Sequence, residues 1–521
     1  MICITAVEVL PVAAPPTGFG ADARNLAQGG PVYANVYLRV HTSDPSLVGH
    51  SIIFTNGRGL KEQCDLTLRM AQRTLLKSSL DIAALHKGYG FGQFVQNLMQ
   101  DSDYAWLGSA GMSRMAAGAI INALWDLMSQ RLKLPAWRAL LTLTPEQLVS
   151  LIDFEPIADV LSPAEACAML KRARAGLPER EQALLAQGLL AYNTAGWSGI
   201  ELPALCGQVR HLIDELWPHI KIKVGAEFAR ERLAASRRGD RLTRGQLDDM
   251  AKRAAASDTE RLLAVFATID EHDRRMQKMT LAVDSNQVFD VQSALVFIRK
   301  LARNLYKTNP RYQIQWFEEP TNPHSALGHL QIKHGLQMAF VDCEPPLQVP
   351  ISTGEQGSNP AIFKDLLFAS LGRFENEKHS AIDVLQMDYC RVAGIADNLA
   401  ILLLVHKARQ QGHEVRLCPH AGGIGLCEGV RHIQAINLAL FGTASAGAAP
   451  DILEYVAEPE RSVHEGIFNN PAIITKGRYR LDNTPGVGVD YSQAGLDRYR
   501  LPDGSAWQES GALQRLAQEL V

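Results

Sequence analysis

Polar side chains that suit acid–base chemistry recur at a nearly constant interval through the second half of the chain. The steps between them are 34, 37, 33, 32 and 34 positions, and most of these residues follow a short apolar run. One strand–helix repeat of a (β/α) barrel takes roughly 30 residues, and catalytic groups in such barrels lie at the carboxyl ends of the strands. The spacing therefore predicts one barrel strand before each of the following residues: Asp284, Glu318, Glu355, Asp388, His420 and Glu454.

Three carboxylates from successive predicted strands, those of Asp284, Glu318 and Glu355, indicate a magnesium site. Hard oxygen ligands without Cys or His suit Mg²⁺, which binds few carboxylates and leaves positions open for a substrate. Glu318 and its neighbour Glu319 face opposite ways on a strand, so only one of them can enter the barrel. Asn286 shares the face of Asp284 and is a further candidate ligand or substrate contact.

Two lysines and a histidine–aspartate pair are the candidate catalytic groups. Lys221 and Lys223, in the segment KIKVG, point to the same face of a strand. Two ammonium groups in a confined site disfavour each other's charge, so one of them is expected to be neutral near pH 7 and to act as a base. Asp388 and His420 are expected on consecutive strands, where the carboxylate fixes the imidazole tautomer and makes it a general acid or base.

Together these groups suit the abstraction of a proton from the carbon next to a carboxylate. That proton is very weakly acidic, so its removal requires stabilisation of the developing enediolate, which a divalent cation provides electrostatically. Where the next carbon carries a hydroxyl, a general acid can expel it as water. The expected reaction is the dehydration of a sugar acid to a 2-keto-3-deoxy acid, with one Mg²⁺ in each subunit.

The elements that must position these groups form two parts. Residues 1 to about 60 contain strand-like runs separated by turns, and residues 61 to about 142 have a helical period. After about residue 148, short apolar runs alternate with helical stretches, which indicates a parallel sheet. We therefore predict an α/β fold, a modified (β/α) TIM-type barrel with an N-terminal α+β capping domain.

The predicted domains are a cap over residues 1–145, a barrel over 146–456, and a C-terminal segment over 457–521 that returns to the cap. The 61 positions from Lys223 to Asp284 exceed one repeat, so a helical insertion is expected near 226–273. Its content of Arg, Ala, Glu and Asp favours a solvated excursion over a partner-binding arm.

Bulk properties exclude several classes of function. The formal net charge is -3 and the pI is near 6.6, so neither nucleic acid nor an anionic membrane is an expected partner. The eight cysteines are scattered without a CxxC pair, which indicates reduced thiols. The N-terminus lacks a basic region before its apolar stretch, and no apolar run is long enough to span a bilayer. We expect a cytoplasmic enzyme that acts on a small molecule.

The order of these motifs resembles the enolase superfamily, mandelate racemase branch, and more narrowly the L-fuconate dehydratase group. The resemblance covers nearly the whole chain. Its most specific stretches are PHAGGIGLCE at 419–428 and IDF at 152–154, whereas KxK and EEP are common to the wider superfamily. Other matching stretches are GADA at 20–23, FTNGRG at 54–59, VDSNQVFD at 283–290, STGEQ at 352–356 and LQMDYCR at 385–391.

The resemblance implies a role for each matching residue of the catalytic set. Lys223 matches the base that takes the C2 proton, with Lys221 beside it. His420, oriented by Asp388, matches the acid that helps the 3-hydroxyl to leave. Glu454 matches the acid that hydrogen-bonds the substrate carboxylate, which requires its protonated form. The residues that match the magnesium ligands are Asp284, Glu318 and Glu355.

The resemblance also implies substrate contacts by Asp22, Asn286 and Arg391, and a homo-oligomer, since many barrels of this type assemble through the cap. The surfaces that set substrate choice depart from the group at residues 32–37 and 108–112, at Glu155 and at residues 197–199. An L-fuconate-like aldonate is therefore an expectation within a class. Two alternatives remain open: a racemase or epimerase in which Lys223 and His420 act on C2 from opposite faces, and an inactive metal-binding homologue that serves as a scaffold.

Overall fold

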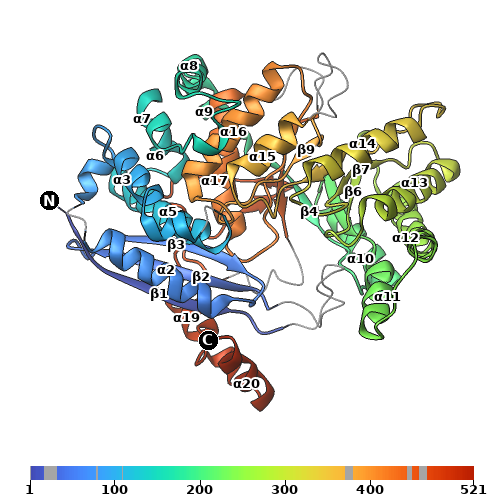
Figure 1. Cartoon of the computed structure of the whole chain (residues 1–521), viewed down its shortest axis with the longest axis horizontal. Helices are drawn as coiled ribbons and strands as arrows, with labels where there is room; N and C mark the ends of the chain where they lie inside the picture. Colours follow the sequence, from blue (N-terminus) through green and yellow to red (C-terminus); the bar gives the residue numbers. More distant parts are fainter. Residues whose placement is uncertain are drawn as a thin grey trace.

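The computed structural model describes residues 2–16, 32–77, 80–107, 110–369, 380–442, 449–456 and 466–521, and the structural statements below refer to these residues. Figure 1 shows a small sheet with flanking helices beside a barrel of strands and helices. The C-terminal helices lie below the small sheet, away from the barrel. The predicted fold class, a barrel with an N-terminal cap, is confirmed.

The cap sheet is antiparallel, in the order β1 (Ile4–Ala13), β2 (Ala34–Thr42), β3 (Val48–Thr55). Helices α2 (Leu60–Leu75) and α5 (Met112–Leu132) pack on it. α5 is buried on all sides because it lies between the cap sheet and barrel helix α16 (Gly394–Gln410). Small residues permit this approach: a Cβ atom on Gly118 would lie 2.3 Å from the backbone oxygen of Val392.

Short helices connect the cap to the barrel. They are η1 (Ile82–Leu85), α3 (Gly90–Met99), α4 (Ser102–Trp106), α6 (Ala136–Leu141), α7 (Pro145–Ser150), η2 (Glu155–Ile157), α8 (Pro163–Ala173) and α9 (Leu177–Gln187). α7 begins with a capping box, in which Thr144 and Gln147 each satisfy a backbone amide of the other.

The barrel strands run parallel in sequence order. They are β4 (Leu189–Thr194), β5 (His219–Lys223), β6 (Thr280–Asp284), β7 (Ile314–Glu318), β8 (Ile351–Thr353), β9 (Val384–Leu385), β10 (Arg416–Leu417) and β11 (Leu453–Tyr455). β11 pairs with β4, and the amides of Ile452 and Glu454 donate to the backbone oxygens of Leu417 and Pro419 beside β10. These bonds close the sheet into a barrel.

Alternation along these strands places every second side chain inside the barrel. A buried interior cluster is formed by Tyr192, Ala282, Trp316, Val384, Cys418 and Ile452. Two positions further along four of these strands stand Asp284, Glu318, His420 and Glu454. The polar residues therefore gather at the carboxyl ends of the strands, as their spacing predicts.

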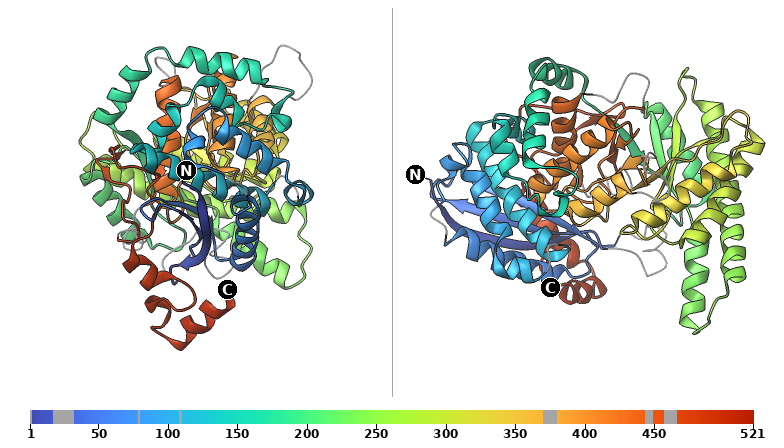
Figure 2. Two further views of the ribbon diagram at one scale, coloured as in Figure 1. Left: turned by 90° about the vertical axis from the view of Figure 1, so that its left-hand side faces the viewer. Right: turned by 45° about the horizontal axis from the view of Figure 1, so that its top comes forward.

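The helices that follow the barrel strands are α10 (Leu202–Asp214), α11 (Ala226–Arg237), α12 (Arg244–His272), α13 (Val291–Thr308), α14 (Ala326–Ala339), α15 (Pro360–Phe368), α16 and α17 (Leu426–Phe441). Within the described parts of the chain, no helix is both long and apolar enough to cross a membrane. α11 and α12 form the long pair at one side of the barrel (Figure 2).

The interpretation of residues 226–273 as a solvated excursion is wrong for α12. This helix packs against α10 and α13 and buries Met250, Ala254, Leu262 and Val265. It is therefore the barrel helix between β5 and β6, and α11 is the added element. Alanines and polar residues at buried positions, among them Ala254, Asp258 and Thr259, weaken the hydrophobic pattern of this face.

The C-terminal segment contacts both parts of the molecule. The hairpin of β12 (Ile474–Thr475) and β13 (Arg478–Tyr479) adds antiparallel to β4. Helices α19 (Gln493–Tyr499) and α20 (Gly511–Glu519) follow, with η3 (Ser505–Trp507) between them. On the cap side, the Trp507 indole donates a 2.8 Å hydrogen bond to the backbone oxygen of Ala13.

A buried ion pair joins the cap to the barrel. The guanidinium of Arg114 on α5 donates to both carboxylate oxygens of Asp397 on α16, at 2.6 and 2.7 Å. Both side chains are almost fully buried, so removal of one partner leaves an uncompensated charge inside the protein.

We expect Arg114→Leu to destabilise the protein by about 3–5 kcal/mol, because the Asp397 carboxylate remains buried without its partner. Urea unfolding followed by circular dichroism measures the change. In the double variant Arg114→Leu/Asp397→Leu most of this loss should be recovered. A single variant as stable as the parent would show that the pair does not hold the cap on the barrel.

Candidate active site

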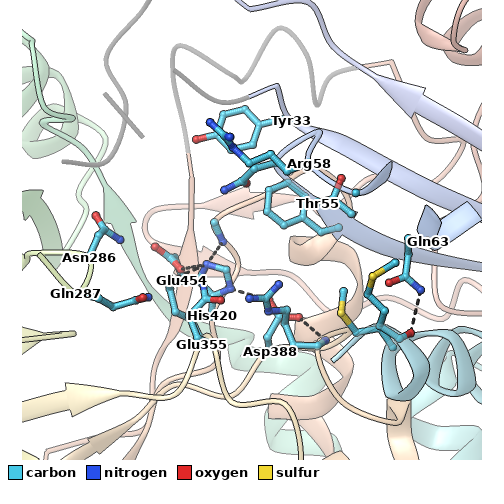
Figure 3. Close-up of a pocket in the computed structure, with 18 of the residues that line it drawn as sticks. Tyr33, Thr55, Arg58, Gln63, Asn286, Gln287, Glu355, Asp388, His420 and Glu454 are labelled. Atoms are coloured by element: carbon cyan, nitrogen blue, oxygen red, sulfur yellow. Dashed lines mark hydrogen bonds and ion pairs between the residues drawn. The ribbon is translucent and has the colours of Figure 1, made fainter. Parts of the chain in front are cut away.

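A cavity of about 400 Å³ lies where the cap covers the carboxyl ends of the barrel strands. Figure 3 shows Tyr33, Arg58 and Thr55 of the cap on one side, and His420 and Glu454 of the barrel on the other. Both parts of the molecule therefore line the same cavity. The barrel side also includes Lys221, Lys223, Asn286, Glu355, Asp388 and Arg391.

Lys221 lies at the centre of a buried set of carboxylates. Its Nζ atom is 2.5 Å from Glu318 Oε1, 2.9 Å from Glu454 Oε1 and 3.4 Å from Asp284 Oδ2. Burial disfavours the ammonium form, but these carboxylates outweigh it and raise the pKa of Lys221 well above its ordinary value. Lys221 is therefore charged, and the expectation of a neutral lysine does not hold for it.

Glu454 is ionised, which corrects the expectation of a protonated acid. Burial would raise its pKa, but Lys221 and His420 lower it well below the ordinary range. Its carboxylate accepts hydrogen bonds from the Thr194 hydroxyl and, at 2.9 Å, from the backbone amide of Ala421. The Glu454 carboxylate thus holds the Lys221 side chain and the loop that follows His420.

Lys223 lies beside Asp284 and an indole ring. Its Nζ atom is 2.5 Å from Asp284 Oδ2 and 5.1 Å from the centre of the Trp197 ring. Lys223 and Trp197 both line the cavity. The Asp284 pKa would be raised by burial, but Lys223 and Lys221 lower it below the ordinary value, so its carboxylate is ionised.

His420 and Asp388 form the expected imidazole–carboxylate pair. His420 Nδ1 is 2.7 Å from Asp388 Oδ2, and Nε2 is 3.3 Å from Glu355 Oε2. Burial lowers the pKa of His420, but Glu355, Asp388 and Glu454 outweigh it and raise the pKa to about 9. Gly422 leaves room for the ring, since a Cβ atom there would lie 2.5 Å from Nε2. The raised pKa favours the protonated imidazole, which can act as an acid.

The predicted magnesium ligands fit a cation by their chemistry. Asp284 and Glu318 are in register on adjacent strands. Burial and the carboxylates of Asp284 and Glu454 raise the pKa of Glu318 to about 8, so added positive charge would favour its ionised form. The Oδ1 atom of Asn286 is buried without a hydrogen-bond partner among the described residues.

The ligand set is not tested by the structure, in which lysines and a histidine pair with the three carboxylates. In the described chain, no group of three or more His, Cys, Asp and Glu side chains is arranged to hold a metal ion. The Lys221 ammonium group contacts both Asp284 and Glu318, the Lys223 ammonium group contacts Asp284, and Glu355 lies against His420. The assignment of Asp284, Glu318 and Glu355 as ligands remains a prediction.

The predicted substrate contacts have mixed outcomes. Asn286 and Arg391 line the cavity, whereas Asp22 lies outside the described residues. Sequence reasoning missed the individual cap residues that reach the cavity, although it located specificity in cap and strand-end loops. The sequence pointed to these residues only through the segments around 32–37, 54–59 and 197–199, which match the resembled group or depart from it. From these segments, Tyr33, Phe54, Thr55, Arg58 and Trp197 line the cavity.

Comparisons with known proteins identify the same architecture. Residues 204–495 match the family model described as Enolase C-terminal domain-like. Mitochondrial enolase superfamily member 1 of Bos taurus is 31% identical, with 95% of each chain covered. L-Galactonate dehydratase of Hypocrea jecorina is 30% identical, with 94% of this chain and 92% of that protein covered.

Solved structures agree on the fold. Human mitochondrial enolase superfamily member 1 superposes with a TM-score of 0.78 at 29% identity, over 97% of this chain and 98% of that one. L-Talarate/galactarate dehydratase from Salmonella typhimurium LT2, liganded with Mg and L-lyxarohydroxamate, gives 0.62 at 20% identity, over 96% and 93%. At that identity the likeness shows the fold alone.

We expect Asp388→Asn to lower the pKa of His420 by about one to two pH units in metal-free protein, because a hydrogen bond to a charged partner contributes about 1.5–3 kcal/mol. The raised His420 pKa stabilises the folded protein below pH 6.5, and this contribution is lost as the pH rises through about 9. Histidine NMR titration with EDTA present measures both forms. An unchanged pKa would show that Glu355 and Glu454 alone set it.

Proposed function

The chain belongs to the enolase superfamily, and from that membership and the geometry of its site we propose that it is a magnesium-dependent sugar-acid dehydratase. The observation that carries the proposal is the arrangement of acid and base across one cavity. Lys223 ends β5, and His420 follows β10 on another side of the barrel, with β11 and β4 between them. A substrate held in the cavity has one of these groups on each side.

Lys223 is the proposed base. Its side chain lines the cavity beside the Trp197 ring, and in its neutral form it takes the C2 proton of the substrate. The C2–H bond breaks and its electron pair delocalises toward the substrate carboxylate. Lys221, which is charged, supplies positive charge close to where that negative charge develops.

His420 is the proposed acid. Its Nδ1 atom is held by Asp388, and its protonated imidazole gives the Nε2 proton to the 3-hydroxyl. The C3–O bond then breaks, water leaves, and the resulting enol becomes the 2-keto-3-deoxy acid.

Mg²⁺ held by Asp284, Glu318 and Glu355 would supply electrostatic stabilisation of the charge that develops on the substrate carboxylate. These carboxylates come from three consecutive strands. Three protein ligands would leave coordination positions of the magnesium ion open for the substrate. The Lys223 ammonium pairs with Asp284 in the protein without a cation. A cation against Asp284 would weaken that pair and favour the neutral amine.

For the substrate we propose an aldonate of the L-galacto configuration. A relative with 30% identity over most of both chains is named an L-galactonate dehydratase, and L-fuconate is the 6-deoxy form of L-galactonate. The two acids share C2 and C3, where the chemistry occurs. Tyr33 and Arg58 on the cap side of the cavity are the proposed contacts of the remaining carbons of the substrate.

We expect Lys223→Ala and His420→Asn each to lower kcat by about 10²- to 10⁴-fold, because each removes a positioned acid or base. The assay is a colour test for 2-keto-3-deoxy products with Mg²⁺ and a panel of sugar acids. Lys61→Ala, which changes an exposed lysine paired with Asp65, is the matched control.

Exchange of the C2 hydrogen in heavy water separates the two roles. His420→Asn should retain exchange, because Lys223 still removes the proton, and Lys223→Ala should lose it. The opposite pattern would reverse the assignment. Appearance of the C2 epimer without a keto product would favour the racemase, and no exchange on any acid of the panel would favour a scaffold.

A further inference from the structure

The end of strand β5 is held by one helix, α12. Asp258 on this helix accepts a 2.8 Å hydrogen bond from the backbone amide of Gly225, directly after the strand. Arg261, one turn further along the same face, donates a 2.6 Å hydrogen bond to the backbone oxygen of Lys223. Both sides of the turn that follows Lys223 are therefore tied to α12.

The same guanidinium also holds the loop that carries Trp197. Arg261 Nη2 donates to the backbone oxygens of Gly196 and Trp197, at 2.8 and 2.9 Å. The amide of Lys223 donates to the oxygen of Gly196 at 3.2 Å, which adds a direct link between loop and strand. A single side chain thus joins the two segments whose side chains meet beside the cavity.

These contacts hold the Lys223 side chain at a set distance from the Trp197 ring. Trp197 is only 3% exposed and lines the cavity, and the centre of its ring lies 5.1 Å from Lys223 Nζ. Both side chains project from backbone that Arg261 binds. A planar guanidinium with several donors in fixed directions can hold three carbonyl groups at once, which an ammonium group cannot do with the same geometry.

We propose that Arg261 is a positioning residue that holds Lys223 against Trp197 for proton transfer. The proposal rests on Lys223 being the base, as in the function proposed above. In this proposal α12, which we interpreted from the sequence as a solvated excursion, supports the active site. The hydrogen bonds that Arg261 donates go to the backbone oxygens of Lys223, Gly196 and Trp197, so it acts on the substrate through Lys223 and Trp197.

The test compares Arg261→Met and Arg261→Lys with Arg253→Met on the same helix, where Arg253 is exposed and paired with Glu231. Arg261→Met should lower kcat by about 10- to 100-fold, since a misplaced catalytic group loses rate steeply. KM should stay within about three-fold, and the isotope effect with C2-deuterated substrate should rise. Arg261→Lys should recover only part of kcat, and Arg253→Met should match the parent protein.

A second measurement works without a substrate. Backbone hydrogen exchange of the segments 194–200 and 219–226 should become faster in Arg261→Met and stay unchanged in Arg253→Met. Asp258→Asn keeps an acceptor for the Gly225 amide, so its exchange should remain close to that of the parent. Thermal unfolding of each variant shows whether the fold is intact.

The outcomes separate the two proposals. Unchanged exchange, or unchanged kcat and isotope effect in Arg261→Met, would overturn the positioning role. A general loss of protection across the barrel would also overturn it, because Arg261 would then be structural. Faster local exchange without turnover of any sugar acid by the parent protein would support the positioning of Lys223 and reject the proposed reaction.

Discussion

The buried ammonium group of Lys221, in contact with three carboxylates, is the interaction on which the site depends. Neither the lysine nor the acids of this set could be buried alone, because an unpaired charge inside a protein costs several kcal/mol. Lys221 satisfies Glu318 and Glu454 at hydrogen-bond distance and approaches Asp284. Side chains from four strands, β5, β6, β7 and β11, therefore meet in one charged cluster at the carboxyl end of the barrel.

This cluster explains why the remaining polar groups have different protonation states. Glu454 is ionised because it faces Lys221 and His420, whereas the more crowded Glu318 has a raised pKa. The pKa of His420 is raised because three carboxylates outweigh the effect of its burial. The surroundings of each group, more than its residue type, thus set its pKa. Among these groups, the imidazole of His420 is the proposed proton donor that faces the cavity.

The sequence predicted the barrel, the cap and the residues at the strand ends, because each depends on a local period or a repeated spacing. Alternation along β5 placed Lys221 and Lys223 on one face, and the repeat length placed Asp388 beside His420. The protonation of Glu454 and the direction of Glu355 were not predictable in this way. They depend on which side chains from other strands approach within a few ångströms, and no spacing encodes that.

The same reasoning shows why α12 was misjudged and why it matters. Between Met250 and Leu262 its buried face carries alanines, Asp258 and Thr259, which interrupt the apolar stripe by which packed helices are recognised. Its contribution to the site is a hydrogen bond from Arg261 to the backbone of Lys223, and such bonds leave no trace in residue patterns. A barrel that places reactive side chains on its strand ends needs fixed backbone beneath them, because those ends are joined to loops. In this protein the charged cluster fixes the Lys221 side of β5, and α12 fixes the Lys223 side.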